Sequence, residues 1–312
     1  MGKKITVFGS FVVDLMGRTP HLPVPGETVK GNVFKMGPGG KGFNQGVAAH
    51  KAGADVSMVT KLGKDTFATV ALDTMKSLKM DTKYVFQTED AETGAALIMV
   101  DEKSSQNEIV VVLGACNTIT DDEVESLSNL LEESDYLLTQ LETNVSAVEK
   151  VVDIAKKKGV KVILNTAPVQ PISDELLSKI DLITPNEVEA ETLTGIPVTN
   201  EENAGKAADW FFAKGVKEVL ITLGGRGVYI ATKDKRGIIP AFKVEAIDTT
   251  GAGDAFNGGL VTALAEGKDI WDASIFASAL AALSVQKIGT TPAMPSRSEI
   301  DEFLAERKEE LK

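Results

Sequence analysis

Cysteine is almost absent from this chain, since Cys116 is the only one among 312 residues. A single thiol excludes an intrachain disulfide and a metal cage built from several cysteines. Histidine is nearly as scarce: His21 and His50 are the only two, and neither stands at a spacing typical of a metal or catalytic site. We therefore expect a protein of a reducing compartment and assign neither histidine a role.

Excess positive charge and long apolar runs are also missing. The chain has 45 acidic and 33 basic residues, which argues against a protein whose main task is to bind a nucleic-acid backbone. A nucleotide is still allowed, because glycine-loop amides, a helix N-terminus and a metal ion can hold one triphosphate locally. No membrane-length apolar window and no secretory leader pattern is visible. We expect a soluble cytoplasmic protein with no nucleic-acid or membrane partner.

What the chain does contain is an alternation of β-rich and helical segments from about residue 120. Such alternation predicts βαβ units and a mainly parallel sheet with helices on both faces. Strands are expected at 136–141, 161–164, 182–184, 218–222 and 227–231, and helices at 145–157, 174–177, 187–193, 203–213, 254–265, 270–285 and 296–312.

Two stretches, 15–35 and 93–113, interrupt this alternation, and neither supplies a crossover helix. The second has the pattern of a β-hairpin. We expect the two stretches to pair as a small separate sheet, a lid made of two insertions in a single α/β domain that spans residues 1–312.

The lid strands carry apolar residues, for example Ala96, Ile98 and Val100. A single copy of the chain would expose them, and pairing with a second copy would cover them. The sequence therefore predicts a homodimer joined through the lids.

Residues 248–254, with the sequence Asp-Thr-Thr-Gly-Ala-Gly-Asp, lie between a predicted strand and a predicted helix. Small residues here leave backbone amides exposed where the helix dipole points outward. This arrangement is an anion hole, suited to the charge on a transferring phosphoryl group. Asp254 could alternatively do no more than cap the helix.

Residues 37–45, Gly-Pro-Gly-Gly-Lys-Gly-Phe-Asn-Gln, form a glycine-rich turn before a helix expected at 45–52. The glycines allow the backbone to approach a ligand, while Lys41 and Asn44 supply polar groups. A tight strand-to-helix turn without a ligand is the alternative. The spacing fits neither a Walker A loop nor a Rossmann fingerprint.

Together these two segments resemble the two signatures of the ribokinase (PfkB-type) carbohydrate kinases, and the resemblance covers essentially the whole chain. It is strongest for ribokinases and deoxyribokinases. Supporting segments occur in the same order at 9–14, 25–28, 140–142, 185–189 and 222–227.

The resemblance implies a ribokinase-like three-layer α/β sandwich with a mainly parallel central sheet plus a small β-sheet lid. It also implies an enzyme of carbohydrate metabolism, a phosphotransferase that uses ATP and Mg²⁺ to phosphorylate the 5-hydroxyl of D-ribose or 2-deoxy-D-ribose. Another sugar or nucleoside kinase of the family, and a non-catalytic sugar or nucleotide sensor, are the alternatives. Retention of Asp254 argues against the sensor, because binding alone does not need that carboxylate.

Site residues are implied as well. Asp254 would accept the proton of the sugar hydroxyl, and the amides of Gly251, Ala252 and Gly253 would form the anion hole. The sugar would be bound by Asp14, Val12, Gly40, Lys41, Asn44, Glu142 and Asp254. The nucleotide would be bound by Asn186, Thr222, Gly224, Arg226, Gly227, Gly253 and Ser278. Asn186 and Glu189 would organise Mg²⁺ indirectly, through water and phosphate.

Simpler interpretations stay open for some of these residues. Glu142 and Asn186 stand at strand ends, where loop capping alone could explain them. Arg226 could be a solvated turn residue.

Two departures from the family pattern bear on ligands. A monovalent cation, K⁺, would be held by Asp248, Thr250, Ser284, Lys287 and Gly289. Ala293 stands where the family has a serine, which removes one oxygen ligand, so activation by K⁺ is an open question.

The second departure is Val12, which replaces the asparagine that ribokinases proper direct at O2 of the sugar. Valine can neither donate nor accept a hydrogen bond, so a ribose 2-hydroxyl would be partly unpaired, at a cost of about 1–3 kcal/mol. The sequence thus favours 2-deoxyribose, unless a water or a neighbouring residue meets O2 instead.

Overall fold

The structure is a computed structural model, and it describes residues 3–104 and 106–307. Its main sheet consists of β1 (Lys4–Phe8), β4 (Asp55–Gly63), β5 (Val85–Thr88), β8 (Tyr136–Thr139), β9 (Lys161–Leu164), β10 (Leu182–Ile183), β11 (Glu218–Thr222), β12 (Val228–Ala231) and β13 (Arg236–Ile239). The strand order is β13-β12-β11-β10-β9-β8-β1-β4-β5. Neighbouring strands are parallel except at β11–β12 and β12–β13, which confirms the mainly parallel sheet.

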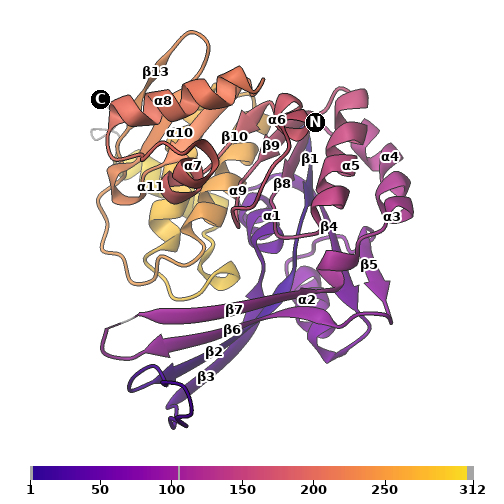
Figure 1. The fold of residues 1–312 in the computed structure, drawn as a ribbon, viewed down its shortest axis with the longest axis vertical. Helices are drawn as coiled ribbons and strands as arrows, with labels where there is room; N and C mark the ends of the chain where they lie inside the picture. The colour runs from indigo at the N-terminus through magenta and orange to yellow at the C-terminus, as the bar shows by residue number, and fades with distance from the viewer. Residues whose placement is uncertain (1–2, 105, 308–312) are drawn as a thin grey trace.

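Helices cover both faces of this sheet (Figure 1). One layer contains α1 (Lys41–Lys51), α2 (Thr66–Ser77), α9 (Ala252–Ala265), α10 (Ile270–Ser284) and α11 (Arg297–Glu306). The other contains α3 (Asp121–Ser126), α4 (Ser128–Glu132), α5 (Val145–Lys157), α6 (Asp174–Ser178), α7 (Glu187–Thr194) and α8 (Glu201–Ala213). In β8, Leu138 belongs to the first core and Leu137 to the second, because successive side chains of a strand point to opposite faces. The three-layer architecture is as predicted.

Most element boundaries agree with the sequence pattern, and α5 and β9 agree to the residue. The helix expected to start at residue 45 is a correction, because α1 starts at Lys41. Lys41 and Asn44 therefore belong to the first helical turn. The helix expected at 296–312 is α11, which ends at Glu306, and residues 308–312 lie outside the described part. No described helix is long and apolar enough to cross a membrane.

A second, smaller sheet projects from the body (Figure 1). It is made of β2 (Val12–Thr19), β3 (Val33–Gly39), β6 (Thr93–Asp101) and β7 (Asn107–Gly114), in the order β3-β2-β6-β7. The two interrupting stretches thus pair with each other, as expected. β2 runs parallel to β6 and antiparallel to β3.

The prediction that Ala96, Ile98 and Val100 are the exposed apolar residues of this sheet is wrong. Ala96 is buried, and Ile98 and Val100 are half-buried. Alternation along β6 instead places Leu97 on the exposed face. The register puts Leu97 in one row with Met36 of β3 and Val110 of β7, and all three side chains are exposed.

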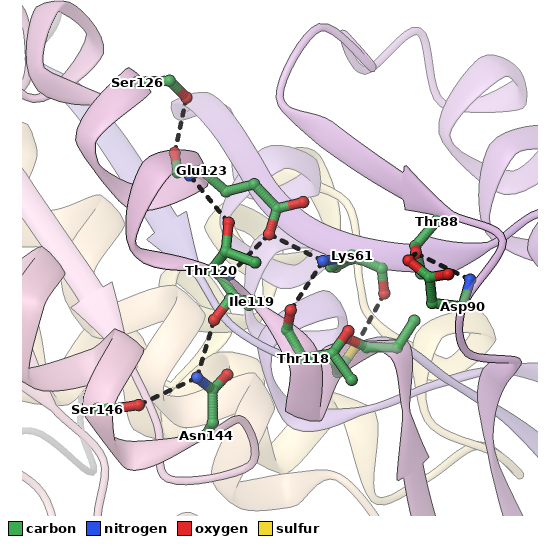
Figure 2. Close-up of polar contacts among 12 residues, drawn as sticks. Lys61, Thr88, Asp90, Thr118, Ile119, Thr120, Glu123, Ser126, Asn144 and Ser146 are labelled. Atoms are coloured by element: carbon green, nitrogen blue, oxygen red, sulfur yellow. Dashed lines mark hydrogen bonds and ion pairs between the residues drawn. The ribbon is translucent and has the colours of Figure 1, made fainter.

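A buried ion pair fixes the point where β7 returns to the body (Figure 2). Lys61 of β4 has a side chain that is 5% exposed; its Nζ lies 2.9 Å from Oε2 of Glu123 and donates to the Thr118 carbonyl at 2.8 Å. The same carboxylate accepts from the Thr120 amide at 2.8 Å. Next to this pair, the Cys116 thiol donates to the Lys61 carbonyl at 3.1 Å. The cluster thus ties β4 to the segment that follows the small sheet.

Replacing Lys61 by methionine is expected to lower the free energy of unfolding by about 2–3 kcal/mol, because Glu123 and the Thr118 carbonyl lose their buried partner. Urea unfolding measures the change. Lys64→Met is the matched control, because the Lys64–Glu89 pair is mostly exposed and such pairs contribute little. Equal effects of the two substitutions would contradict a structural role for the buried pair.

Candidate active site

The polar residues singled out in the sequence gather at one end of the main sheet, where the parallel strands finish. Glu142 follows β8, Asn186 follows β10, and Gly224 follows β11. Asp14 lies on β2, which continues directly from β1. Open α/β sheets bind their ligands at this edge, so the topology alone makes this edge the candidate site.

Glu142 joins three segments at this edge. Its Oε2 accepts from the Ser10 hydroxyl at 2.5 Å and from the Lys41 amide at 2.8 Å. Gly40 makes this junction possible: its φ is 91°, and a Cβ there would lie 2.8 Å from the Val12 nitrogen. The start of α1 therefore approaches the β1–β2 connection more closely than any other residue would permit.

Asp254 is the third residue of α9 and is 7% exposed. Its Oδ2 accepts from Asn44 Nδ2 at 3.1 Å, and its Oδ1 accepts from Gln45 Nε2 at 3.0 Å. Both donors belong to α1, so this carboxylate serves the contact between two helices and is not explained by capping of its own. Burial raises the pKa of Asp254, while the charge of Lys41 and the two amide donors oppose the increase.

Close helix packing positions these donors. Gly258 of α9 faces α1, and a Cβ there would lie 2.5 Å from the Cβ of Ala48 and 2.7 Å from the Gln45 carbonyl. On the other side of α1, a Cβ on Gly42 would lie 2.6 Å from the Gly9 backbone. Glycine at both positions lets α1 fit between α9 and the end of β1.

The charges of Asp254, Glu142 and Glu189 act on one ammonium group, that of Lys41, while Asp14 interacts with Glu142 and Asp254. Burial lowers the pKa of Lys41, but the charges of Asp254, Glu142 and Glu189 raise it above its ordinary value. Burial raises the pKa of Asp14 to about 6; the charges of Glu142 and Asp254 add to this, and a hydrogen bond from Thr290 opposes it. The ionisation of Asp14 therefore changes near pH 6.

Val12 and Asp14 lie on the same face of β2, since alternate residues of a strand share a face. The Asp14 carboxylate lies over β3, where a Cβ on Gly39 would be 2.2 Å from its Oδ1. Val12 is buried, and its Cγ1 would lie 2.9 Å from a Cβ on Gly94 of β6. The side chain beside Asp14 therefore offers packing surface and no polar atom.

A cleft of about 590 Å³ opens beside α9. The predicted nucleotide residues Asn186, Thr222, Gly224, Gly227, Gly253 and Ser278 all line it. Its apolar wall consists of Ala241, Phe242, Val244, Ala246, Phe256, Ala281, Ala282 and Val285. This wall was missed in the sequence, because no motif or spacing distinguishes its members from ordinary core residues.

The cleft reaches the start of α9 at Ala252 and Gly253. Gly251 begins this helix with a φ of 77°. A Cβ on Gly253 would meet no atom within 4 Å, so this glycine faces open space. The Ala252 amide donates to the Thr249 carbonyl at 3.2 Å. The structure therefore brings the predicted anion hole and the cleft together.

Asn186 and Glu189 form a reciprocal capping box at the start of α7. The Glu189 amide donates to Asn186 Oδ1 at 2.8 Å, and the Asn186 amide donates to Glu189 Oε2 at 3.0 Å. Thr166 also donates to this carboxylate at 3.0 Å. Asn186 thus caps α7, as one of the two interpretations predicted. The side-chain oxygens of Asn186 and Glu189 are hard ligands, which suit Mg²⁺ bound through its waters.

Arg226 is directed toward the α7–α8 connection. Its guanidinium pairs with Glu187 and donates to the Thr199 carbonyl at 2.9 Å. Glu187 lines the cleft, so Arg226 reaches the nucleotide region through this carboxylate. Its direct contact with phosphate stays a prediction.

The predicted cation ligands are brought together only in part. Asp248 accepts from the Thr250 amide at 3.0 Å and from the Gly289 amide at 2.9 Å. Burial raises the pKa of Asp248, but these two amides lower it more. The Ser284 hydroxyl donates to the Ala281 carbonyl, and Lys287 pairs with Glu299. Lys287 therefore has only its backbone carbonyl to offer, whereas the Ser284 hydroxyl oxygen keeps its lone pairs.

Comparison with known proteins gives a consistent result. A family model described as pfkB family carbohydrate kinase matches residues 2–297. The ribokinase of Haemophilus influenzae is 46% identical over 304 residues, which cover 97% of this chain and 99% of that protein. The deoxyribokinase of Salmonella typhi is 36% identical over 302 residues, 96% of this chain and 98% of that protein.

A solved structure extends this comparison to three dimensions. Arabidopsis thaliana ribokinase complexed with ribose and ATP has a TM-score of 0.90 to this chain at 32% identity. The match covers 97% of this chain and 99% of that one.

Asp14→Asn is expected to stabilise the ligand-free protein at neutral pH. The pKa of Asp14 is about 6 in the folded state, against an ordinary 3.8, so the folded state binds the proton more tightly and loses stability as the pH rises between these values. The variant should gain about 3 kcal/mol at pH 7 and about 0.5 kcal/mol at pH 4. Unfolding free energies at both pH values measure this, with the exposed Asp73→Asn as control. A variant less stable than wild type at pH 7 would contradict the burial argument.

Proposed function

Because the chain belongs to the pfkB family of carbohydrate kinases, we propose that it transfers the γ-phosphoryl group of ATP to the 5-hydroxyl of D-ribose or 2-deoxy-D-ribose. One observation carries this proposal: residues of α1 hold the buried Asp254 at the N-terminus of α9, between the other carboxylates of the site and the cleft. The names of the relatives support a pentose, since they are called ribokinase and deoxyribokinase.

In the proposed reaction, Asp254 accepts the proton of the sugar's primary hydroxyl. The sugar oxygen then forms a bond to the γ-phosphorus while the bond from that phosphorus to the bridging oxygen breaks, and ADP leaves. The amides of Gly251, Ala252 and Gly253, at the positive end of α9, stabilise charge on the transferring group. Little covalent chemistry is needed beyond this positioning.

The sugar would be bound by side chains already held in place. Asp14 and Glu142 accept hydrogen bonds from hydroxyl groups, and Asn44 and Lys41 donate to them, with Gly40 giving the sugar access to the backbone. Val12 presents only carbon beside Asp14. A 2-deoxy sugar loses nothing there, whereas a ribose 2-hydroxyl loses a partner. We therefore propose that 2-deoxy-D-ribose is used at least as well as D-ribose.

ATP would occupy the cleft. Its base would pack on the apolar wall that includes Phe242 and Val244, while Thr222, Gly224, Gly227 and Ser278 would line the polar side. The Arabidopsis ribokinase, which was solved in complex with both ribose and ATP, supports a site for a nucleotide beside a site for a sugar. Mg²⁺, when bound, neutralises charge on the β- and γ-phosphates, and Asn186 and Glu189 would hold it through water.

Asp248, Thr250, Ser284, Lys287 and Gly289 would surround a monovalent cation next to the anion hole. The hydrogen bond from the Gly289 amide to the Asp248 carboxylate, which joins the two loops, supports such a site. Ala293 supplies no hydroxyl there, so we propose at most a modest activation by K⁺.

The whole chain would act as one α/β kinase domain with the small sheet as its lid, formed by the insertions at about 15–35 and 93–113. We propose that two copies pair through these lids. The exposed row of Met36, Leu97 and Val110 supports this, because a monomer would leave a continuous apolar strip in water.

The reaction needs ATP, and the one thiol, Cys116, is free and buried. We therefore place the enzyme in the cytoplasm, where fractionation of source cells should recover it.

A coupled assay of ADP release tests the proposed reaction. Purified protein with Mg-ATP should turn over D-ribose and 2-deoxy-D-ribose, and fructose and adenosine much less. Asp254→Asn should lower kcat by about 10²–10⁴-fold, because the general base is lost, while ATP still binds. Replacing K⁺ by tetramethylammonium should change the rate little. Binding of sugar without turnover would favour the sensor, and a far higher kcat/KM for ribose would overturn the proposed role of Val12.

Sedimentation velocity at micromolar concentration tests the dimer. Wild type should sediment as a dimer, and Leu97→Lys combined with Val110→Lys should sediment as a monomer, because charges are costly in a buried apolar strip. Ile238→Lys, at a partly exposed position on β13 of the main sheet, is the control. A monomeric wild type would contradict pairing through the lids.

A further inference from the structure

A line of hydrogen-bonded, buried side-chain amides ends at Asp254. Apart from the contact between Gln45 and Asp254, these amides have no part in the reaction proposed above. Gln140, just after β8, donates through Nε2 to Gln45 Oε1 at 2.6 Å. Gln45 donates through Nε2 to Asp254 Oδ1 and to Asn165 Oδ1, each at 3.0 Å. All four side chains are buried. Two strand ends are thereby connected to the carboxylate through one glutamine.

The orientation of the Gln45 amide in this line is fixed by its neighbours. Asn165 donates through Nδ2 to the Thr184 carbonyl at 2.9 Å, so its oxygen must face Gln45. Gln140 places a donor against Gln45 Oε1. Turning the Gln45 amide around would set its oxygen against two other oxygens and its nitrogen against a nitrogen. Gln45 therefore always presents N–H groups to Asp254.

The far end of the line has an unusual feature. Gln140 Oε1 is buried and has no hydrogen-bond partner among the described residues. A Cβ on Gly9 would lie 2.1 Å from this oxygen, so the glycine makes the room that the amide needs. An unpartnered buried oxygen destabilises a protein. Here the unpartnered atom lies at the end remote from Asp254, and the donor end faces the carboxylate.

We propose that Gln45, oriented by Gln140, is a positioning residue that holds Asp254 as an ionised acceptor and leaves its remaining lone pairs to the sugar hydroxyl. This inference rests on the proposed kinase function. Asp254 accepts from Gln45 on Oδ1 and from Asn44 on Oδ2. Both N–H bonds are stronger to a carboxylate than to a neutral carboxyl group, so the line favours the ionised form.

Other charges also act on Asp254. Lys41 favours ionisation, while burial and Glu142 oppose it, and Asp14 adds a further negative charge nearby. Removing Gln45 leaves these groups in place. The effect of the amide line can therefore be measured against a constant background.

The pH dependence of kcat in the holoenzyme assay, with Mg-ATP and pentose, is the first test. Gln45→Met should move the acid limb of the profile up by about one pH unit, since one hydrogen bond to a charged group is lost. At pH values below the midpoint of the wild-type acid limb, kcat should fall about 10-fold with KM values little changed. Gln45→Glu, which keeps the shape but adds a charge, should move the limb further, and Gln140→Met should move it less.

Gln170→Met is the matched control, because this half-buried glutamine donates to the Leu141 carbonyl and does not contact Asp254. Its profile should match wild type. An active wild type together with an unmoved acid limb in both Gln45 variants would overturn the inference alone, whereas an inactive wild type would count against the proposed function.

A second measurement does not need activity. Asp254→Asn should raise the melting temperature at pH 7 by about 2–4 °C more in the Gln45→Met background than in wild type, because the carboxylate is then less well supported. Equal increments in the two backgrounds would overturn the inference. If Gln45→Met does not fold, the same cycle with Gln140→Met keeps the test open, with a smaller expected difference in the same direction.

Discussion

The position of helix α1 is the constraint on which the rest of this site depends. Its first turn lies against the end of β1, and its middle lies against α9, with glycine at Gly42 and Gly258 where the backbones come closest. A single added methyl group at either glycine would overlap its neighbour. From this one helix come the amide that binds Glu142, the lysine among the carboxylates and both donors to Asp254. Close packing of the backbone thus sets the position of the Asp254 carboxylate.

Charge at the site is only partly neutralised, in a chain whose overall charge is −12. One ammonium group, that of Lys41, feels the charges of Asp254, Glu142 and Glu189. Under the proposed function, the phosphates would be bound at the end of the cleft by backbone amides and a helix terminus, which carry no net charge. A nucleotide site built in this way needs no basic surface, and the acidic composition and the kinase family membership are therefore compatible.

Local sequence patterns were sufficient for the architecture, and they singled out polar residues that the structure brings to one end of the main sheet. The limits of α5 and β9 follow from apolar periodicity. The small residues at 248–254 predicted an anion hole, with helix capping by Asp254 as the alternative. Exposure in the small sheet was predicted wrongly, because a strand pattern gives alternation but not which face is covered. The Gln45–Asp254 contact spans 209 positions, and no local pattern signals a contact between residues so far apart.

One strand connects the small sheet to the candidate site. Val12 and Asp14 belong to β2, the same strand that runs outward into the projecting sheet (Figure 1). Any rotation of that sheet relative to the body carries both side chains with it. Under the proposed function, the angle between the small sheet and the body would therefore set where Val12 and Asp14 stand against the sugar.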